Sequence, residues 1–220
     1  ALKKALAMSP GSHGVGVAVI NYRLQPQVQW RDQVRDVAHA LAWVRSNISQ
    51  YSGDARRIYL MGHSAGAHLA AQAALNPEFA LERDTSGSSL CGVISVSGAA
   101  LDLSDAKTYA LGQKLSYYEA RFRDAGANWQ AEASPINFIT LRAPPFLILY
   151  AGGETKALQR QSRLLNDALL THGVKSDLIL VPGQSHARIV LALSRGDKVA
   201  GPAILDFIEN TRSSAPVPQP

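Results

Sequence analysis

A serine between two glycines is the pattern in this chain most able to do chemistry. Gly62-His63-Ser64-Ala65-Gly66 has the G-x-S-x-G spacing, directly after a strand predicted for 57–61 and directly before a helix predicted for 64–75. In such a tight turn the serine hydroxyl projects above a sheet, where it can attack an acyl carbon. The two glycines are small enough to let strand and helix approach closely. The structural alternative is a glycine-rich turn with a capping serine.

The start of the predicted helix offers a place for negative charge. The first turn of a helix carries free amide hydrogens and a partial positive charge. An oxyanion formed at the Ser64 hydroxyl would therefore take a hydrogen bond from the backbone N–H of Ala65. We expect this amide to be one donor of an oxyanion hole.

A serine hydroxyl is a weak nucleophile and needs a base, usually a histidine. His186 lies in a loop just after the last predicted strand, 176–181, at the sheet edge where the serine also lies. This position agrees with the chain order serine, acid, histidine that is expected of this topology. We therefore predict His186 as the base. The other histidines are assigned to packing, hydrogen bonding or solvent: His13, His39, His63, His68 and His172.

The acid that orients the base has two candidates. Glu154 is the first carboxylate after the strand predicted for 146–150, and Asp102 follows the strand that ends near residue 97. We favour Glu154, with Asp102 as its rival. Asp167 and Asp177 lie on a helix and at the start of a strand, and are assigned to solubility or capping.

The elements that would hold these residues alternate between strand and helix along the chain. This alternation predicts an α/β fold with a mostly parallel sheet flanked by helices. The predicted strands are 14–22, 57–61, 92–97, 146–150 and 176–181, and the predicted helices are 32–48, 64–75, 159–172 and 199–210.

One domain, residues 1–212, accounts for these elements. Residues 101–143 form a long connection between two strands, which is typical of an insertion near a site. Several aromatic residues in this insertion favour a role in shaping a substrate pocket, and ordinary packing is the alternative. Residues 213–220, rich in serine and proline, are predicted to be a disordered tail.

Composition excludes several classes of protein. The longest apolar stretches are strand-sized, so we expect no membrane span. The chain has 22 Lys and Arg against 17 Asp and Glu, a net charge of +5, but the basic residues are scattered, which argues against nucleic acid. The single cysteine, Cys91, leads into a predicted strand and is expected to be an inert, buried thiol. One unpaired cysteine favours a reducing compartment such as the cytoplasm.

Several motifs together resemble the α/β-hydrolase superfamily, and within it the carboxylesterase, hormone-sensitive-lipase-like and arylformamidase-like branches. The resemblance covers nearly the whole chain. Its motifs are Asn21-Tyr22-Arg23-Leu24 with Pro26, the helix at 36–48, the segment 62–70, Ser134-Pro135, Ala143-Pro144-Pro145 and the loop of His186.

The resemblance implies a serine hydrolase that cleaves carboxylic esters with small or medium acyl groups through an acyl-enzyme, without metal or organic cofactor. In the formamidase-like branch, a stretch similar to 153–162 carries the catalytic acid, which supports Glu154. It also implies an alternative substrate class, N-formyl aryl amines such as N-formylkynurenine. A non-catalytic binding module on the same scaffold is the third hypothesis.

The family also has a glycine-rich oxyanion loop after an early strand. Gly11-Ser12-His13-Gly14 resembles it superficially, but these residues abut the strand predicted for 14–22 and are interpreted as a turn after a first helix. The chain opens on Ala1-Leu2-Lys3-Lys4, which has the pattern of a helix interior. We therefore expect the first strands and the oxyanion loop to be absent from this sequence.

Overall fold

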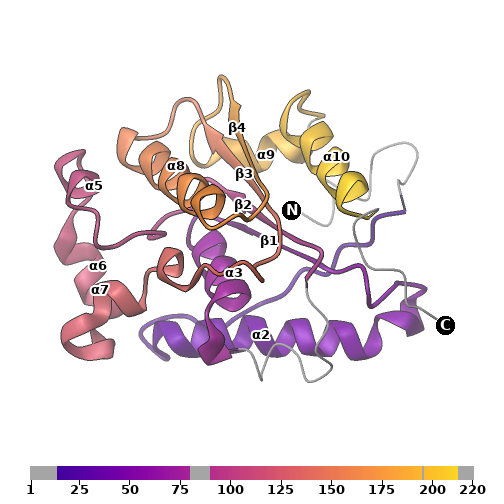
Figure 1. Cartoon of the computed structure of the whole chain (residues 1–220), viewed down its shortest axis with the longest axis horizontal. Coiled ribbons are helices and arrows are strands. Elements are labelled where there is room, and N and C mark those ends of the chain that lie inside the picture. The colour runs from indigo at the N-terminus through magenta and orange to yellow at the C-terminus, as the bar shows by residue number, and fades with distance from the viewer. Residues whose placement is uncertain (1–13, 80–89, 195, 213–220) are drawn as a thin grey trace.

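The computed structural model describes residues 14–79, 90–194 and 196–212 (Figure 1). The expectations on residues 1–13 and on the tail at 213–220 lie outside these residues. The elements, with η for 3-10 helices, are α2 (Trp30–Asn47), η1 (Ile48–Tyr51), β1 (Tyr59–His63), α3 (Ala65–Leu75), η2 (Pro77–Phe79), β2 (Gly92–Val96), α5 (Ala106–Ala110), α6 (Leu115–Phe122), η3 (Arg123–Asn128), α7 (Trp129–Glu132), η4 (Pro135–Phe138), β3 (Phe146–Ala151), α8 (Lys156–Thr171), β4 (Ser176–Val181), α9 (Arg188–Ser194) and α10 (Ala200–Arg212).

A parallel sheet forms the centre of the molecule. Its strands lie in the order β1-β2-β3-β4, and each neighbouring pair is parallel. At the carboxyl end, His63 of β1 lies beside Val96 of β2, and Val96 lies beside Leu149 of β3. The loops that follow the strands therefore leave the sheet at the same edge, as the predicted α/β fold requires.

The two faces of the sheet build two separate clusters of buried side chains, because successive residues of a strand point to opposite faces. In β3, Phe146 and Ile148 belong to one cluster, whereas Leu147 and Leu149 belong to the other. All six residues of this strand are buried. Burial on both faces explains why the central strands have continuous apolar sequences.

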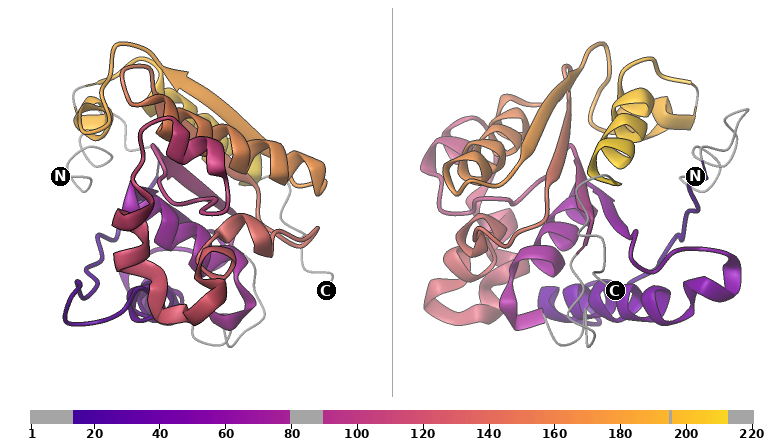
Figure 2. Two further views of the ribbon diagram at one scale, coloured as in Figure 1. Left: turned by 90° about the vertical axis from the view of Figure 1, so that its left-hand side faces the viewer. Right: turned by 45° about the vertical axis from the view of Figure 1, so that its right-hand side comes forward.

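Helices cover both faces. The first cluster contains side chains of α2, α3 and α8, and the second contains side chains of α9 and α10. Figure 2 shows the sheet with α8 on one side and α10 on the other. Helix α2 follows the predicted period, since Val34, Val37, Ala38 and Leu41 are buried along one stripe. This arrangement confirms the predicted fold class.

The strand predicted for 14–22 is not formed. In the described part of the chain the sheet ends at β1, and residues 15–24 have neither strand nor helix geometry. Val19 is 57% exposed, while Ile20 and Tyr22 pack against the first cluster. A β-branched, apolar sequence favours an extended chain, but a strand also needs a neighbour that completes its backbone hydrogen bonds. The prediction of a strand buried on both faces was wrong here.

Residues 101–143 contain short helices instead of one long crossover. They pack against α3 and α8. His68 of α3 bonds the carbonyl oxygen of Ala133 at 2.8 Å, and Arg160 of α8 forms an ion pair with Asp105 at 2.7 Å. The aromatic rings of Tyr118, Phe122 and Trp129 are buried in the first cluster. The burial of these three rings supports a packing role.

Candidate active site

Ser64 lies in the tight turn between β1 and α3. Its backbone has φ 55° and ψ −119°, and residues other than glycine rarely adopt a positive φ of this kind. The N–H of Ser64 donates a hydrogen bond of 3.0 Å to the carbonyl oxygen of Val96, at the end of β2. The neighbouring strand thus stabilises the strained turn. This is the strand-turn-helix context that the sequence predicted for the serine.

Of the two glycines that flank the serine turn, Gly62 and Gly66, only one is needed for the close approach of β1 and α3. A Cβ atom on Gly62 would overlap the carbonyl group of Gly66, whereas a Cβ on Gly66 would meet nothing within 4 Å. The backbone at Gly66 therefore packs directly against Gly62. The expectation that both glycines serve the approach of strand and helix is corrected to Gly62 alone.

His186 lies between Ser64 and Glu154. Its Nε2 is 2.8 Å from Oγ of Ser64, and its Nδ1 is 3.1 Å from Oε2 of Glu154. An ionised carboxylate only accepts hydrogen bonds, so Nδ1 carries the hydrogen and donates. In the neutral imidazole, Nε2 then has a free lone pair and accepts from the Ser64 hydroxyl. The structure thus brings together the three side chains that the sequence singled out.

Glu154 is held by the loop that follows β3. Its side chain has no exposed surface, and its Oε1 has no hydrogen-bond partner among the described residues. The side-chain amide of Gln159 donates to the carbonyl oxygens of Gly152 at 3.0 Å and of Glu154 itself at 3.3 Å. These bonds hold the backbone of the loop that presents the carboxylate to His186.

Asp102, the rival acid, is engaged elsewhere. Its Oδ1 accepts the backbone N–H of Ser104 at 2.9 Å, and its backbone exchanges two hydrogen bonds of 2.8 Å with the side chain of Gln161. Burial raises the pKa of the Asp102 carboxyl above its ordinary value. Within the described residues, it is Glu154 and not Asp102 that contacts His186.

The other histidines have different surroundings. His68 is buried in α3, and burial lowers its pKa to about 4. His39 and His172 are exposed, and His13 lies outside the described residues. His63 packs on the ring of His186 and bonds the backbone of that residue. The local assignment of His63 missed this contact, and the only signal was its place inside the G-x-S-x-G pattern.

Cys91 directly precedes β2 and is half-buried. Its thiol donates a hydrogen bond of 3.0 Å to the carbonyl oxygen of Arg56. Burial raises the pKa of this thiol, which keeps it in the unreactive protonated form. An inert thiol is consistent with these surroundings.

Ala65 is the first residue of α3, where an amide hydrogen has no acceptor within the helix. The residue is exposed and directly follows Ser64 in the chain. A partial positive charge at this helix end favours an anion there. The position suits the expected oxyanion donor.

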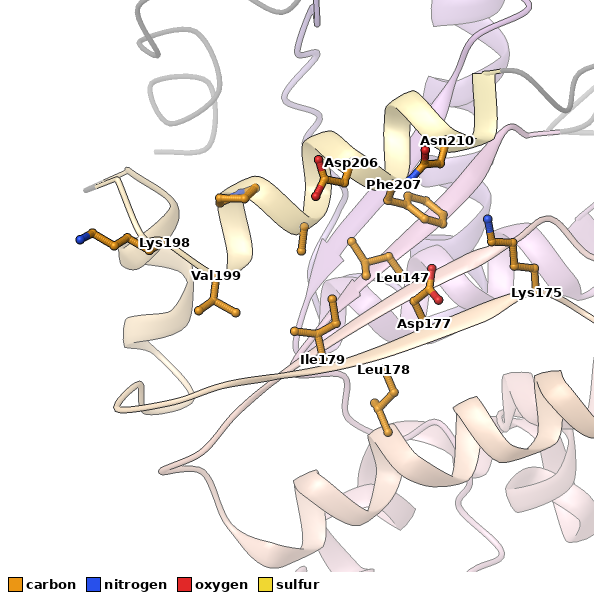
Figure 3. Close-up of a pocket in the computed structure, with 12 residues that line it drawn as sticks. Leu147, Lys175, Asp177, Leu178, Ile179, Lys198, Val199, Asp206, Phe207 and Asn210 are labelled. Atoms are coloured by element: carbon orange, nitrogen blue, oxygen red, sulfur yellow. The ribbon is translucent and has the colours of Figure 1, made fainter.

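A cavity of about 490 Å³ lies away from these residues. It opens between β4 and α10, with Lys175 and Asp177 on one side and Asp206 and Asn210 on the other (Figure 3). None of the described residues that line it belongs to the serine, histidine and glutamate cluster. Nor do three metal-binding side chains gather anywhere in the described ranges. No described helix is long and apolar enough to cross a membrane.

Comparison with known proteins places the chain in a family. A model of the BD-FAE family matches residues 4–169, which is more than half of the chain. The chain belongs to the BD-FAE family. Its fold and its relatives are those of the carboxylesterase-like α/β-hydrolases, as the sequence motifs indicated.

This BD-FAE chain is similar to several curated proteins. It is 31% identical over 196 residues to the esterase LipQ of Mycobacterium tuberculosis, covering 86% of this chain and 46% of LipQ. It is 27% identical over 202 residues to the isoprenylcysteine alpha-carbonyl methylesterase ICME of Arabidopsis thaliana, covering 84% of this chain and 46% of that protein. The chain therefore spans about half the length of these relatives.

Solved structures show the same fold as this BD-FAE chain. A truncated carbohydrate esterase from gut microbiota has a TM-score of 0.66 at 24% identity, covering 88% of this chain and 73% of that one. Apo esterase 2 of Thermogutta terrifontis has a TM-score of 0.66 at 26% identity, covering 90% of this chain and 72% of that one. These likenesses support the α/β-hydrolase architecture.

Proposed function

We propose that this chain carries the catalytic residues of a serine hydrolase that cleaves carboxylic esters. One observation carries the proposal: the imidazole of His186 reaches Ser64 with Nε2 at 2.8 Å and Glu154 with Nδ1 at 3.1 Å. These distances support the roles of nucleophile for Ser64, base for His186 and orienting acid for Glu154. The esterase names of the relatives support a carboxylic ester as the substrate.

The reaction is a two-step acyl transfer. His186 takes the hydroxyl proton of Ser64 at Nε2 while Oγ forms a bond to the ester carbonyl carbon. The oxyanion accepts a hydrogen bond from the N–H of Ala65, and the positive imidazole is stabilised by Glu154. As the carbonyl re-forms, the C–O bond to the alcohol breaks, and the proton passes from Nε2 to the leaving oxygen.

The second step releases the acid. His186 removes a proton from water, and the hydroxide forms a bond to the carbonyl carbon of the acyl-serine. When the bond from this carbon to Oγ breaks, the proton on Nε2 returns to Ser64. The chain's own residues supply every proton transfer, so this chemistry requires no metal or organic cofactor.

Replacing the nucleophile tests the proposal. We expect Ser64→Ala to lower kcat for p-nitrophenyl acetate by at least about 10³-fold, because Ser64 forms the covalent bond. A fluorophosphonate probe should label the wild-type chain at Ser64, as mapped by mass spectrometry. Ser49→Ala, at an exposed position of η1, is the matched control and should keep its activity.

Two outcomes would overturn the proposal. Undiminished turnover by folded Ser64→Ala would exclude this serine as the nucleophile. Absence of both labelling and hydrolysis in the full-length protein would favour the non-catalytic binding module. A much higher kcat/KM for N-formylkynurenine than for simple esters would change the proposed substrate class from carboxylic esters to N-formyl aryl amines.

A further inference from the structure

His63 links the nucleophile turn to the backbone of the base. It is the last residue of β1 and directly precedes Ser64. Its Nε2 lies 2.8 Å from the backbone carbonyl oxygen of His186. The centres of the two imidazole rings are 4.8 Å apart, with a tilt of 41° between the ring planes. The side chain therefore makes a polar contact and a ring contact with the same residue.

The direction of the hydrogen bond follows from its acceptor. A backbone carbonyl oxygen only accepts, so Nε2 of His63 carries the hydrogen and donates it. Burial lowers the pKa of the His63 imidazole below its ordinary value. The neutral ring with hydrogen on Nε2 is sufficient for the bond. No positive charge on His63 is required, and such a charge would oppose the positive form of His186 that appears during catalysis.

The position of His63 gives this bond a geometric consequence. Ser64 and His63 are adjacent, so their backbones move together with the end of β1. The hydroxyl of Ser64 bonds Nε2 of the His186 ring, and Nε2 of His63 bonds the backbone carbonyl oxygen of His186. Two hydrogen bonds, one to the ring of His186 and one to its backbone, therefore fix this residue relative to the nucleophile turn.

We propose that His63 is a positioning residue: its Nε2–H holds the backbone of His186 so that the imidazole spans Ser64 and Glu154. The inference rests on the proposed function, because the alignment matters for the transfer of the serine proton. Displacement of a reacting group by about 1 Å can cost on the order of 10²-fold in rate. The hydrogen bond of His63 is made to the backbone of His186, so His63 acts through that residue.

The competing explanation is that the ring of His63 only fills space beside His186. Two substitutions separate the explanations. His63→Phe keeps an aromatic ring of similar shape and removes the donor. His63→Gln removes the ring and keeps an amide N–H at about the reach of Nε2. If the hydrogen bond positions the base, Gln preserves activity and Phe does not. If packing of the ring positions the base, His63→Phe preserves activity and His63→Gln does not.

The experiment measures kcat and KM for p-nitrophenyl acetate with the full chain and both variants. We expect His63→Phe to lower kcat about 10-fold to 100-fold, with KM changed less than about threefold. We expect His63→Gln to keep kcat within about fivefold of the wild type. Circular dichroism and thermal melting check that each variant folds. A kcat for His63→Phe within about twofold of wild type, or a lower kcat for Gln than for Phe, would overturn the inference.

A second readout remains if the wild type does not hydrolyse esters. The hydrogen-bonded Nδ1–H of His186 gives a low-field proton signal in nuclear magnetic resonance, and this signal reports its contact with Glu154. We expect the signal in the wild type and in His63→Gln, and its loss or broadening in His63→Phe. Retention of the signal in His63→Phe would contradict the positioning role. Fluorophosphonate labelling of wild-type Ser64 decides the proposed function separately.

Discussion

The amide of Gly153 donates a hydrogen bond of 2.8 Å to the carbonyl oxygen of Gln184. This bond joins the loop that carries Glu154 to the loop that carries His186, beyond the last paired residues of β3 and β4. A Cβ atom on Gly153 would lie only 3.0 Å from the same carbonyl oxygen. The close approach of the two loops, and with it the distance between the Glu154 carboxylate and the His186 imidazole, therefore depends on the absence of a side chain at Gly153.

We expect Gly153→Ala to separate the two loops and to lower kcat for p-nitrophenyl acetate by about tenfold or more, since His186 loses its alignment with Glu154. Gly152→Ala is the matched control, because a Cβ there would make an ordinary contact of 3.4 Å with Leu180. Its kcat should stay within about threefold of wild type. Equal losses in the two variants would show that the close contact at Gly153 has no special role.

The two glycines of the nucleophile turn should differ in their effect on stability. Gly62→Ala places a methyl group against the backbone of Gly66, and should lower the free energy of unfolding by about 3 kcal/mol or prevent folding. Gly66→Ala meets open space within α3, and should be neutral or raise stability by up to about 1 kcal/mol. Urea denaturation monitored by circular dichroism measures both. A neutral Gly62→Ala would contradict the close approach of strand and helix.

The choice of acid can be tested with two isosteric amides. Glu154→Gln removes the negative charge beside Nδ1 of His186, so we expect kcat to fall by about 10²-fold to 10⁴-fold. Asp102→Asn keeps an oxygen that can accept the N–H of Ser104, and should change kcat by less than about threefold. Steady-state kinetics on a short p-nitrophenyl ester gives both values. The reverse order of effects would assign the acid to Asp102.

His68 should make the stability of the fold depend on pH. Burial lowers its pKa to about 4 in the folded chain, below the ordinary value of 6.5. The unfolded chain therefore binds a proton first, and the free energy of unfolding falls as the pH drops from about 6.5 to about 4. A shift of this size corresponds to roughly 3 kcal/mol at most.

Urea denaturation at pH 7, 5.5 and 4 measures this effect. In His68→Gln the buried titrating group is absent, while an amide can still donate to the carbonyl oxygen of Ala133. The loss of stability between pH 7 and pH 4 should therefore be smaller in the variant than in the wild type. Identical pH profiles would show that His68 does not titrate as its burial requires.

Local pattern predicted the middle of each sheet strand better than its ends. The prediction for β4 agrees at both ends, whereas β1 was predicted at 57–61 and runs from Tyr59 to His63. Apolar runs mark the buried part of a strand, but its ends depend on backbone pairing, here Tyr59 with Gly92 and His63 with Val96. The same reason explains the failure at 14–22, where an apolar run has no neighbouring strand in the described sheet.

Helix α9 was missed for a different reason. It has only seven residues, too short for a clear period over several turns. Its signal was present but weak: Ile189, Ala192 and Leu193 have helical spacing and are buried. The side chain of Ser185 accepts the N–H of Arg188 at 3.4 Å, just before the helix begins. Such a short helix becomes stable by packing against the second cluster more than by its own propensity.

The sequence by itself determined which residue types meet at one edge of the sheet. Parallel strands joined by helices all end at the same edge, so a serine, carboxylates and a histidine that follow different strands must gather there. This reasoning depends only on chain order and on period. It selected Ser64 and His186 without the help of coordinates.

Only the tertiary structure decided which groups at that edge contact each other. Glu154 and Asp102 both follow a strand, and no local pattern measures their distance from His186. The fold buries Glu154 against the imidazole and engages Asp102 with Ser104. The contact between His63 and His186 likewise joins residues 123 positions apart. Contacts at such separations depend on how the loops pack over the sheet, which no local pattern of residues encodes.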